Sequence, residues 1–223
     1  MTLDAQVELT RRRITEIGRL LFDRFLTDAA GGNISSRAGD CICITPRYSG
    51  GRHQWHLRPE QVLVCDLDGK QIAGEGELSR EAEVHLRLYR DFADCGAVIH
   101  AHPRHVLVFC AAARPIVPVL EGTLKFGEVK VVEFAPAHSP DLAEHVARGI
   151  QGQEERIRRH AAAVIAPWHG LFVAGRDLNL AFDAVERIDE NAQCLLQGQA
   201  LVDGADALRR ERQALADAMA RHK

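Results

Sequence analysis

Three histidines, at two widely separated places in the chain, are the residues whose type and spacing best suit a metal centre. His100 and His102 are separated by one alanine behind an apolar run, and His169 stands beside a glycine far downstream. Catalytic zinc usually has three protein ligands and leaves a fourth position open for water or substrate. The three histidines would supply that set, so the sequence predicts a metal-dependent enzyme.

His100 and His102 are expected to lie on a β-strand. Side chains at positions i and i+2 of a strand project from the same face, with Cβ atoms about 6 to 7 Å apart. At that spacing two imidazoles can converge on one ion, each with a nitrogen about 2.0–2.1 Å from it. The alternative is a chance pair of histidines at a strand edge, and His169 alone is also compatible with an ordinary surface loop.

Glu81 is the acidic residue that best fits a role beside such an ion, as a ligand or a proton carrier. Ser79 is expected to cap a helix that continues to about Phe92, which places Glu81 in the first turn. A glutamate there also complements the helix dipole, so a purely structural role is the alternative. His85 follows one turn later on the same face, where it could orient Glu81 or be a core histidine.

A second polar segment, residues 31–35, comes directly after the first predicted helix. Exposed backbone N–H groups and a side-chain amide donor make Gly32 and Asn33 suitable for an anion-binding loop. The same residues are equally typical of a helix C-cap followed by a turn.

Length and composition suit one α/β domain over residues 1–223, because 46% of the 223 residues are hydrophobic and can form a full core. The net charge is −3 with both signs interspersed, which argues against nucleic acid or an anionic membrane as a partner. We expect no signal peptide and no membrane span. The six cysteines form no C-x-x-C pair, so reduced thiols in the cytoplasm are expected.

Hydrophobic periodicity predicts short strands interspersed among helices. Strands are expected at residues 42–45, 62–65, 97–100, 129–134, 162–166 and 171–174, with a hairpin turn at 66–69. Helices are expected at residues 4–28, 79–92, 141–150, 178–197 and 205–222, and after Pro103. The arginine-rich runs 11–13 and 156–159 are expected on solvated helix faces.

The combination of motifs along the chain is more specific than any one of them. In order they are Gly32-Asn33-Ile34-Ser35, Ile44-Thr45-Pro46, Val62 to Gly69, Glu81 with His85, His100-x-His102 and His169-Gly170. In this order and spacing they resemble the class II aldolase/adducin family, from the first helix to about Gln197.

The resemblance implies a central, mostly antiparallel sheet flanked by helices, in a homotetramer with active sites at subunit interfaces. It implies that His100, His102 and His169 hold zinc, although three imidazoles can also hold manganese, cobalt or iron. A glutamate at the position of Glu81 would act as acid/base, and it can ligate the metal when substrate is absent.

The implied chemistry is cleavage of a C–C bond β to a carbonyl, which leaves an enediolate. A divalent ion stabilises that charge as a Lewis acid, and a carboxylate moves the proton at the adjacent carbon. The same apparatus serves decarboxylases and dehydratases of the family. Adducin-like members lack the metal ligands, so the intact ligand set here argues against a non-catalytic member.

The substrate-binding segments depart from the pattern of the sugar-phosphate aldolases. Those enzymes carry Thr-Pro-Ser-Gly, whose serine and glycine cradle phosphate, whereas Arg47 and Tyr48 precede Ser49-Gly50 here. They also often have two serines before the glutamate, and here Arg80 replaces the second. Arginine binds phosphate or carboxylate in bidentate fashion, so an anionic substrate with either anchor is expected. The alternative is that Arg47 and Arg80 face solvent.

The second acid is a further departure. Fuculose-phosphate-type enzymes use a tyrosine from a neighbouring subunit, between the H-x-H strand and the third histidine. This chain has no tyrosine in that segment, and Glu121 stands near the corresponding place. Glu121 is therefore a candidate proton donor, with a plain loop glutamate as the alternative.

The sequence thus predicts a zinc-dependent lyase that performs retro-aldol cleavage of a small anionic hydroxy-carbonyl compound such as a sugar phosphate. A decarboxylase of a hydroxylated or oxo acid is the closest alternative, and a non-catalytic adducin-like oligomerisation module is an alternative of another class. The expected substrate-binding residues are Gly32, Asn33, Ser49, Gly50, Ser79 and Arg80.

Overall fold

The computed structural model describes residues 2–198, 210, 213–214 and 217. Within these residues eight strands form one sheet in the order β4-β3-β2-β1-β5-β8-β7-β6. Neighbouring strands are antiparallel except β6 and β7, which are parallel, so the expected mostly antiparallel sheet is confirmed. The strands are β1 (Asn33–Ala38), β2 (Cys41–Ile44), β3 (Leu63–Cys65), β4 (Gln71–Ala73), β5 (Ala97–Ala101), β6 (Lys130–Val131), β7 (Ala162–Ala166) and β8 (Gly170–Gly175).

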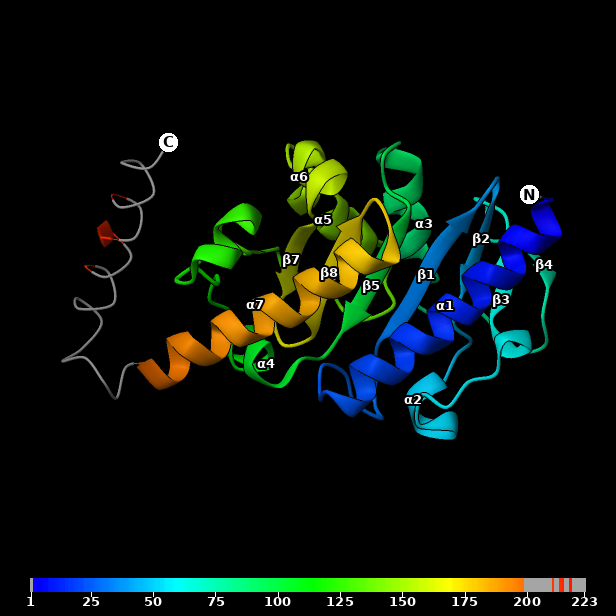
Figure 1. Cartoon of the computed structure of the whole chain (residues 1–223), viewed down its shortest axis with the longest axis horizontal. Helices are drawn as coiled ribbons and strands as arrows, with labels where there is room; N and C mark the ends of the chain where they lie inside the picture. Colours follow the sequence, from blue (N-terminus) through cyan, green and yellow to red (C-terminus); the bar gives the residue numbers. More distant parts are fainter. Residues whose placement is uncertain (1, 199–209, 211–212, 215–216, 218–223) are drawn as a thin grey trace.

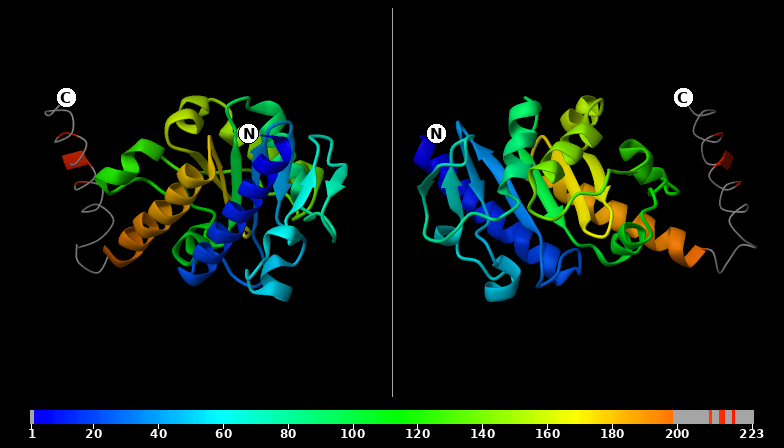
Figure 2. Two further views of the ribbon diagram at one scale, coloured as in Figure 1. Left: turned by 45° about the vertical axis from the view of Figure 1, so that its right-hand side comes forward. Right: turned by 180° about the vertical axis from the view of Figure 1, so that it is seen from behind.

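Helices cover both faces of the sheet. Figure 1 shows α1 and α7 side by side across one face, and the reverse view in Figure 2 shows α3, α5 and α6 on the other. The helices are α1 (Leu3–Asp23), α2 (Ser49–His53), α3 (Ala82–Asp91), α4 (Arg104–Ala111), α5 (Pro140–Ile150), α6 (Glu154–Arg159) and α7 (Leu178–Gly198), with 3₁₀ turns η1 (Pro59–Gln61) and η2 (Glu121–Phe126). No helix among the described residues has both the length and the apolar character needed to cross a membrane.

The sheet separates two hydrophobic cores, because successive strand residues point to opposite faces. On β5, Ile99 packs into the core beneath α1 and α7, whereas Val98 packs into the core beneath α3 and α5. His100 follows on the Val98 side, where its ring stacks on buried Phe172 with centroids 4.2 Å apart. The first histidine of the candidate metal site therefore projects from the α3 face of the sheet.

The first helix ends at Asp23, so the expected extension to residue 28 is wrong. Phe25 adopts a left-handed backbone with φ 59°. The N–H of Leu26 bonds to the carbonyl of Leu21 at 2.8 Å, and that of Phe25 to Phe22 at 3.1 Å. These are the two bonds of a Schellman C-cap, which usually has glycine at the left-handed position. Because phenylalanine occupies this position, the sequence lacks the glycine that usually marks the end of a helix.

The prediction that Ser79 is the N-cap of α3 is also wrong. The helix begins at Ala82 with Glu81 as the preceding cap residue. The hydroxyl of Ser79 instead accepts hydrogen bonds from the backbone N–H of Glu81 at 3.3 Å and the amide of Asn33 at 3.0 Å. Ser79 therefore belongs to the turn that delivers Glu81.

Other predicted boundaries differ in short elements. Strands β1 and β4 and helix α2 were not predicted, and the strand expected at residues 129–134 is only Lys130–Val131. The second arginine-rich run was expected on a helix, and it lies on α6. The hairpin turn at 66–69 joins the paired strands β3 and β4. The helix expected at 205–222 lies outside the described residues, apart from isolated positions.

Candidate active site

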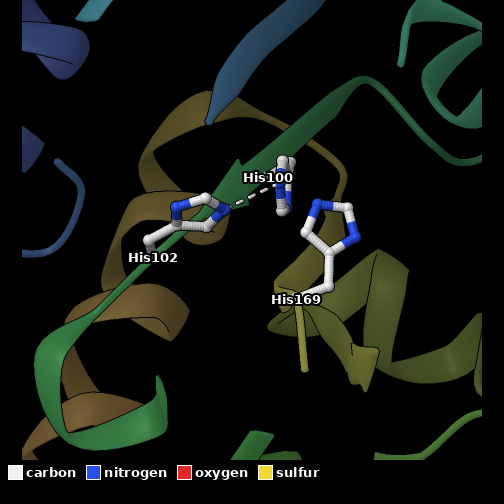
Figure 3. A group of neighbouring side chains, drawn as sticks. All are labelled: His100, His102 and His169. Atoms are coloured by element: carbon white, nitrogen blue, oxygen red, sulfur yellow. Dashed lines mark hydrogen bonds between the residues drawn. The ribbon is translucent and has the colours of Figure 1, made fainter. Parts of the chain in front are cut away.

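The three histidines come together because of the register between β5 and β8. The last pair of that ladder is Ala101 with Leu171, so the residue after β5 lies next to the start of β8. Residues 167–169 form a tight turn between β7 and β8 and place His169 at the same edge. Figure 3 shows the imidazoles of His100, His102 and His169 converging.

The distances within this cluster suit a single ion. Ligand atoms of the three histidines all lie within 4.8 Å of one another. The Nε2 atoms of His100 and His102 are 3.2 Å apart. Two nitrogens of a tetrahedral site, each about 2.0–2.1 Å from the ion, lie about 3.3 Å apart. The separation between these two nitrogens is therefore that of two ligands on one ion.

Outer hydrogen bonds orient two of the rings. Nδ1 of His100 donates to the carbonyl of Leu171 at 3.0 Å, and Nδ1 of His102 lies 3.4 Å from the carboxylate of Asp28. A proton on each Nδ1 leaves the Nε2 lone pairs facing the cluster, the arrangement typical of metal-bound histidine. Burial lowers the pKa of His100 to about 3, so its imidazole is neutral and able to ligate.

Two glycines make room for the rings. A Cβ on Gly31 would lie 2.2 Å from Cε1 of His102. A Cβ on Gly170 would lie 2.7 Å from Cδ2 of His102 and 2.9 Å from Cε1 of His100. These are shorter than a carbon–carbon contact allows, so both positions require glycine if the imidazoles are to stay where they are.

The carboxylate of Glu81 lies against the cluster and is buried, with 5% of the residue exposed. Oε1 is 2.9 Å from Nε2 of His169, and Oε2 is 3.3 Å from Nε2 of His100. The contact with His169 is not aligned as a hydrogen bond, so Oε1 is a buried oxygen without a hydrogen-bond partner. Burial raises the pKa of Glu81, but the neighbouring histidines and the Asn33 amide outweigh it and hold that pKa well below its usual range.

These features fit a divalent ion. The cluster offers three imidazole nitrogens, and a buried carboxylate oxygen without a hydrogen-bond partner faces it. Such an oxygen is costly to bury unless another group binds it. The donor set is one that zinc accepts, and other imidazole-binding divalent metals accept it too.

A small cavity of about 100 Å³ adjoins Glu81. It is lined by all six residues expected to bind substrate, namely Gly32, Asn33, Ser49, Gly50, Ser79 and Arg80. Arg47 lines it as well and is half-buried, with Nη1 bonded to Glu77 at 2.7 Å and Nε unpartnered. The structure thus brings Arg47 and Arg80 to one anion-sized space, although Arg80 is exposed.

Two of these side chains already have protein partners. The amide N–H groups of Asn33 donate to Ser79 and Glu81, each at 3.0 Å. The hydroxyl of Ser49 donates to the carbonyl of Pro46 at 2.6 Å. Substrate binding by these side chains stays a prediction.

His138 is a cavity residue that the sequence did not single out. It adopts φ 69°, and its Nδ1 lies 3.7 Å from Oε1 of Glu81. Tyr48 has φ 66°, and the guanidinium groups of Arg47 and Arg52 lie 4.7 and 4.6 Å from its ring centre. No spacing in the sequence marks either residue, because a left-handed backbone at a non-glycine position has no reliable sequence signature.

Glu121 does not reach this cavity within the chain. It opens η2, is exposed, and lies in a segment that packs against α7. The histidine cluster and the cavity beside Glu81 do not include it.

Comparison with known proteins agrees with this architecture. Residues 12–196 match the family described as the class II aldolase and adducin N-terminal domain, and the chain belongs to that family. It is 30% identical over 179 residues to an L-fuculose phosphate aldolase of Methanococcus maripaludis, covering 80% of this chain and 91% of the relative. It is also 30% identical over 212 residues to a 3-oxo-tetronate 4-phosphate decarboxylase of Haemophilus influenzae, covering 89% and 91%.

A solved L-fuculose 1-phosphate aldolase shares the fold, with a TM-score of 0.76 and 24% identity over 93% of this chain and 96% of that one. The aldolase relatives support an aldolase-type lyase. The expected family and fold class are thus confirmed.

Proposed function

We propose that this protein is a divalent-metal-dependent lyase that cleaves a C–C bond of a small phosphorylated hydroxy-carbonyl compound in a retro-aldol reaction. The observation that carries the proposal is the convergence of three imidazoles beside the unpartnered oxygen of Glu81. The relatives named for sugar-phosphate cleavage support the choice of substrate class.

His100, His102 and His169 would hold the ion, with zinc as the expected metal. When bound, the ion would supply Lewis-acid stabilisation of the negative charge that bond cleavage leaves on the carbonyl oxygen. Asp28 and the carbonyl of Leu171 would keep two of the rings in the ligating tautomer.

Glu81 would move the proton at the reacting carbon. Its Oε2 is held by the amide of Asn33, whereas Oε1 has no hydrogen-bond partner and can accept a proton. The surrounding groups keep the carboxylate ionised, which is the state a general base needs.

The cavity beside Glu81 would bind the anionic end of the substrate. Gly32 and Gly50 line that space, and so do Arg47 and Arg80. An arginine pair neutralises a phosphate dianion more completely than backbone donors alone, and its forked donors match the oxyanion geometry.

A homotetramer in the cytoplasm, with active sites between subunits, is part of the proposal. Because Glu121 lies outside the chain's own cavity, it would act as second acid only from a neighbouring copy. Sedimentation of the purified protein tests the tetramer, and mixing Glu121→Gln with Glu81→Gln subunits tests the sharing. Restored activity in the mixture is expected, and no restoration would remove Glu121 from the site.

A decarboxylase is the second candidate. It is favoured by the match to the 3-oxo-tetronate 4-phosphate decarboxylase, which spans more residues than the aldolase match at the same identity. Two arginines at one cavity could bind a substrate that bears both carboxylate and phosphate.

A substrate panel separates the two candidates. Metal-loaded protein would be given L-fuculose 1-phosphate, 5-deoxy-D-ribulose 1-phosphate and 3-oxo-tetronate 4-phosphate, with aldehyde and carbon dioxide measured in parallel. Aldehyde release from a sugar phosphate is the expected result. Carbon dioxide without aldehyde would replace the aldolase by the decarboxylase, and no product from any compound would contradict both.

A further inference from the structure

A buried polar ladder joins helix α3 to strand β1 beside the site. Glu81, His85 and Tyr89 recur every four residues at the start and along one face of α3, and Asn33 and Ser35 alternate along β1. Four helical residues rise about 6 Å, and two strand residues rise about 6.6 Å. The two polar rows therefore stay in step. All five residues are at most 5% exposed.

The ladder is continuous. The hydroxyl oxygens of Tyr89 and Ser35 are 2.8 Å apart, and Ser35 Oγ lies 2.6 Å from Nδ1 of His85. Nε2 of His85 contacts Oδ1 of Asn33. The Asn33 amide nitrogen then donates to Oε2 of Glu81 at 3.0 Å. His85 thus reaches the carboxylate only through Asn33.

The direction of every hydrogen bond in the ladder follows from its last member. An ionised carboxylate only accepts, so Asn33 must present its NH₂ group to Glu81 and its oxygen to His85. The oxygen accepts, so Nε2 of His85 carries the proton. Nδ1 of a neutral imidazole is then an acceptor, and it takes the hydroxyl hydrogen of Ser35. Burial lowers the pKa of His85 to about 4, which agrees with a neutral ring.

We propose that His85 is a positioning residue: its Nε2–H locks the Asn33 amide in one orientation and thereby fixes Oε2 of Glu81, leaving Oε1 free toward the histidine cluster. This inference rests on the proposed function only in assigning proton transfer to Glu81. A histidine that merely filled the core would stabilise the fold without affecting the carboxylate.

Without the Nε2–H of His85, nothing holds the Asn33 side-chain oxygen away from Glu81. If the Asn33 amide rotates by half a turn, its oxygen faces the Glu81 carboxylate oxygen in a buried site, where unpaired polar groups are costly. Either the amide or the carboxylate must then move. Residues that orient groups of a metal site in this way typically contribute 10–100-fold to affinity or activity.

Three variants test the role in the metal-loaded protein with L-fuculose 1-phosphate. His85→Leu removes both ring nitrogens and is expected to lower kcat about 10–100-fold. His85→Gln offers an amide N–H at the same end of the side chain and should recover most of that loss. Tyr89→Phe removes a buried hydroxyl at the far end of the ladder and should lower thermal stability while leaving kcat close to the parent value.

Equal kcat losses in His85→Leu and Tyr89→Phe, or no loss in either, would overturn the positioning role. If His85→Leu does not fold, His85→Gln is compared with Asn33→Ala instead. A kcat loss in His85→Gln as large as that in Asn33→Ala would also overturn the positioning role.

A readout without substrate separates this inference from the proposed function. Nitrogen-15 NMR of the folded protein near neutral pH should show His85 protonated at Nε2 and unprotonated at Nδ1. The Asn33 amide protons should shift in His85→Leu but hardly in Tyr89→Phe. The opposite tautomer would refute the ladder even in an active lyase. An inactive protein with the expected tautomer and shifts would refute the lyase and still support the locked amide.

Discussion

Asn33 of β1 and His100 of β5 are direct cross-strand partners in the antiparallel ladder. Opposed residues point to the same face of the sheet, so the amide that binds Glu81 and the most buried histidine of the cluster rise side by side. The separation of carboxylate and imidazole is therefore set by backbone pairing as well as by side-chain rotamers. A shift of register by one residue would carry Asn33 to the other face.

Replacing Glu81 by glutamine should abolish most activity and preserve the fold. The amide is nearly isosteric, but it cannot accept a proton at neutral pH, and general acid–base catalysis contributes about 10²–10⁴-fold. Product release measured with circular dichroism of the same sample checks this. Glu83→Gln is the matched control, because Glu83 is largely exposed and pairs with Arg90 at the surface. Turnover of Glu81→Gln within a few-fold of the parent would remove this carboxylate from the mechanism.

Gly31→Ala should weaken metal binding because the new methyl group overlaps the ring of His102. Overpacking of this kind typically costs about 1–3 kcal/mol, equivalent to a roughly 5- to 150-fold weaker site if the strain falls on the ligated state. Gly51→Ala is the control, since its Cβ would meet nothing closer than 3.4 Å. Competition with a chelator measures both affinities. Unchanged affinity in Gly31→Ala would show that His102 is not held where the structure has it.

Asp28→Asn should reduce metal affinity about 10–100-fold while the three imidazoles remain. The carboxylate lies 3.4 Å from Nδ1 of His102, and this hydrogen bond is the main reason that the pKa of Asp28 is lowered. The uncharged amide of asparagine would not raise the basicity of the His102 imidazole, so His102 would be a weaker metal ligand. Isothermal titration with Zn²⁺ measures the change, and parent-like affinity would contradict the orienting role of Asp28.

His85 should make the protein sensitive to acid. Its pKa falls from the usual 6.5 to about 4 because burial disfavours the charged ring. Between those values the unfolded chain binds a proton that the folded chain does not, so the free energy of unfolding decreases as pH falls. From about pH 7 to about pH 5 the loss is about 2 kcal/mol for this group. In denaturant unfolding, the free energy of unfolding should depend less steeply on pH in His85→Gln than in the parent. Equal pH dependence in the two proteins would show that His85 is not the titrating group.

The histidine cluster was accessible from sequence because its two parts have strong local signatures. His100 lies in the apolar strand β5, and His102 comes one residue after the strand ends at Ala101, so the expectation that both lie on a strand is correct only for His100. The spacing of two still brings their Nε2 atoms to 3.2 Å from each other. Strand β1 was not accessible for an equally physical reason. Its inward residues, Asn33 and Ser35, face the polar ladder of α3, so the strand lacks the apolar alternation that marks a half-buried strand.

The sequence also could not predict the cavity residues that have an unusual backbone conformation. His138 and Tyr48 line the cavity with left-handed backbones, a conformation that depends on tertiary packing rather than on residue type. The same limit explains the end of α1, where Phe25 occupies a position that glycine usually takes.

Metal content of the purified protein tests the central claim most directly. The parent and His145→Ala, whose histidine lies on α5 away from the cluster, should each bind about one divalent ion per chain after dialysis against Zn²⁺. A His100→Ala/His102→Ala variant with parent-like circular dichroism should bind none. Parent protein that binds no metal, or a double variant that binds as the parent does, would contradict the account.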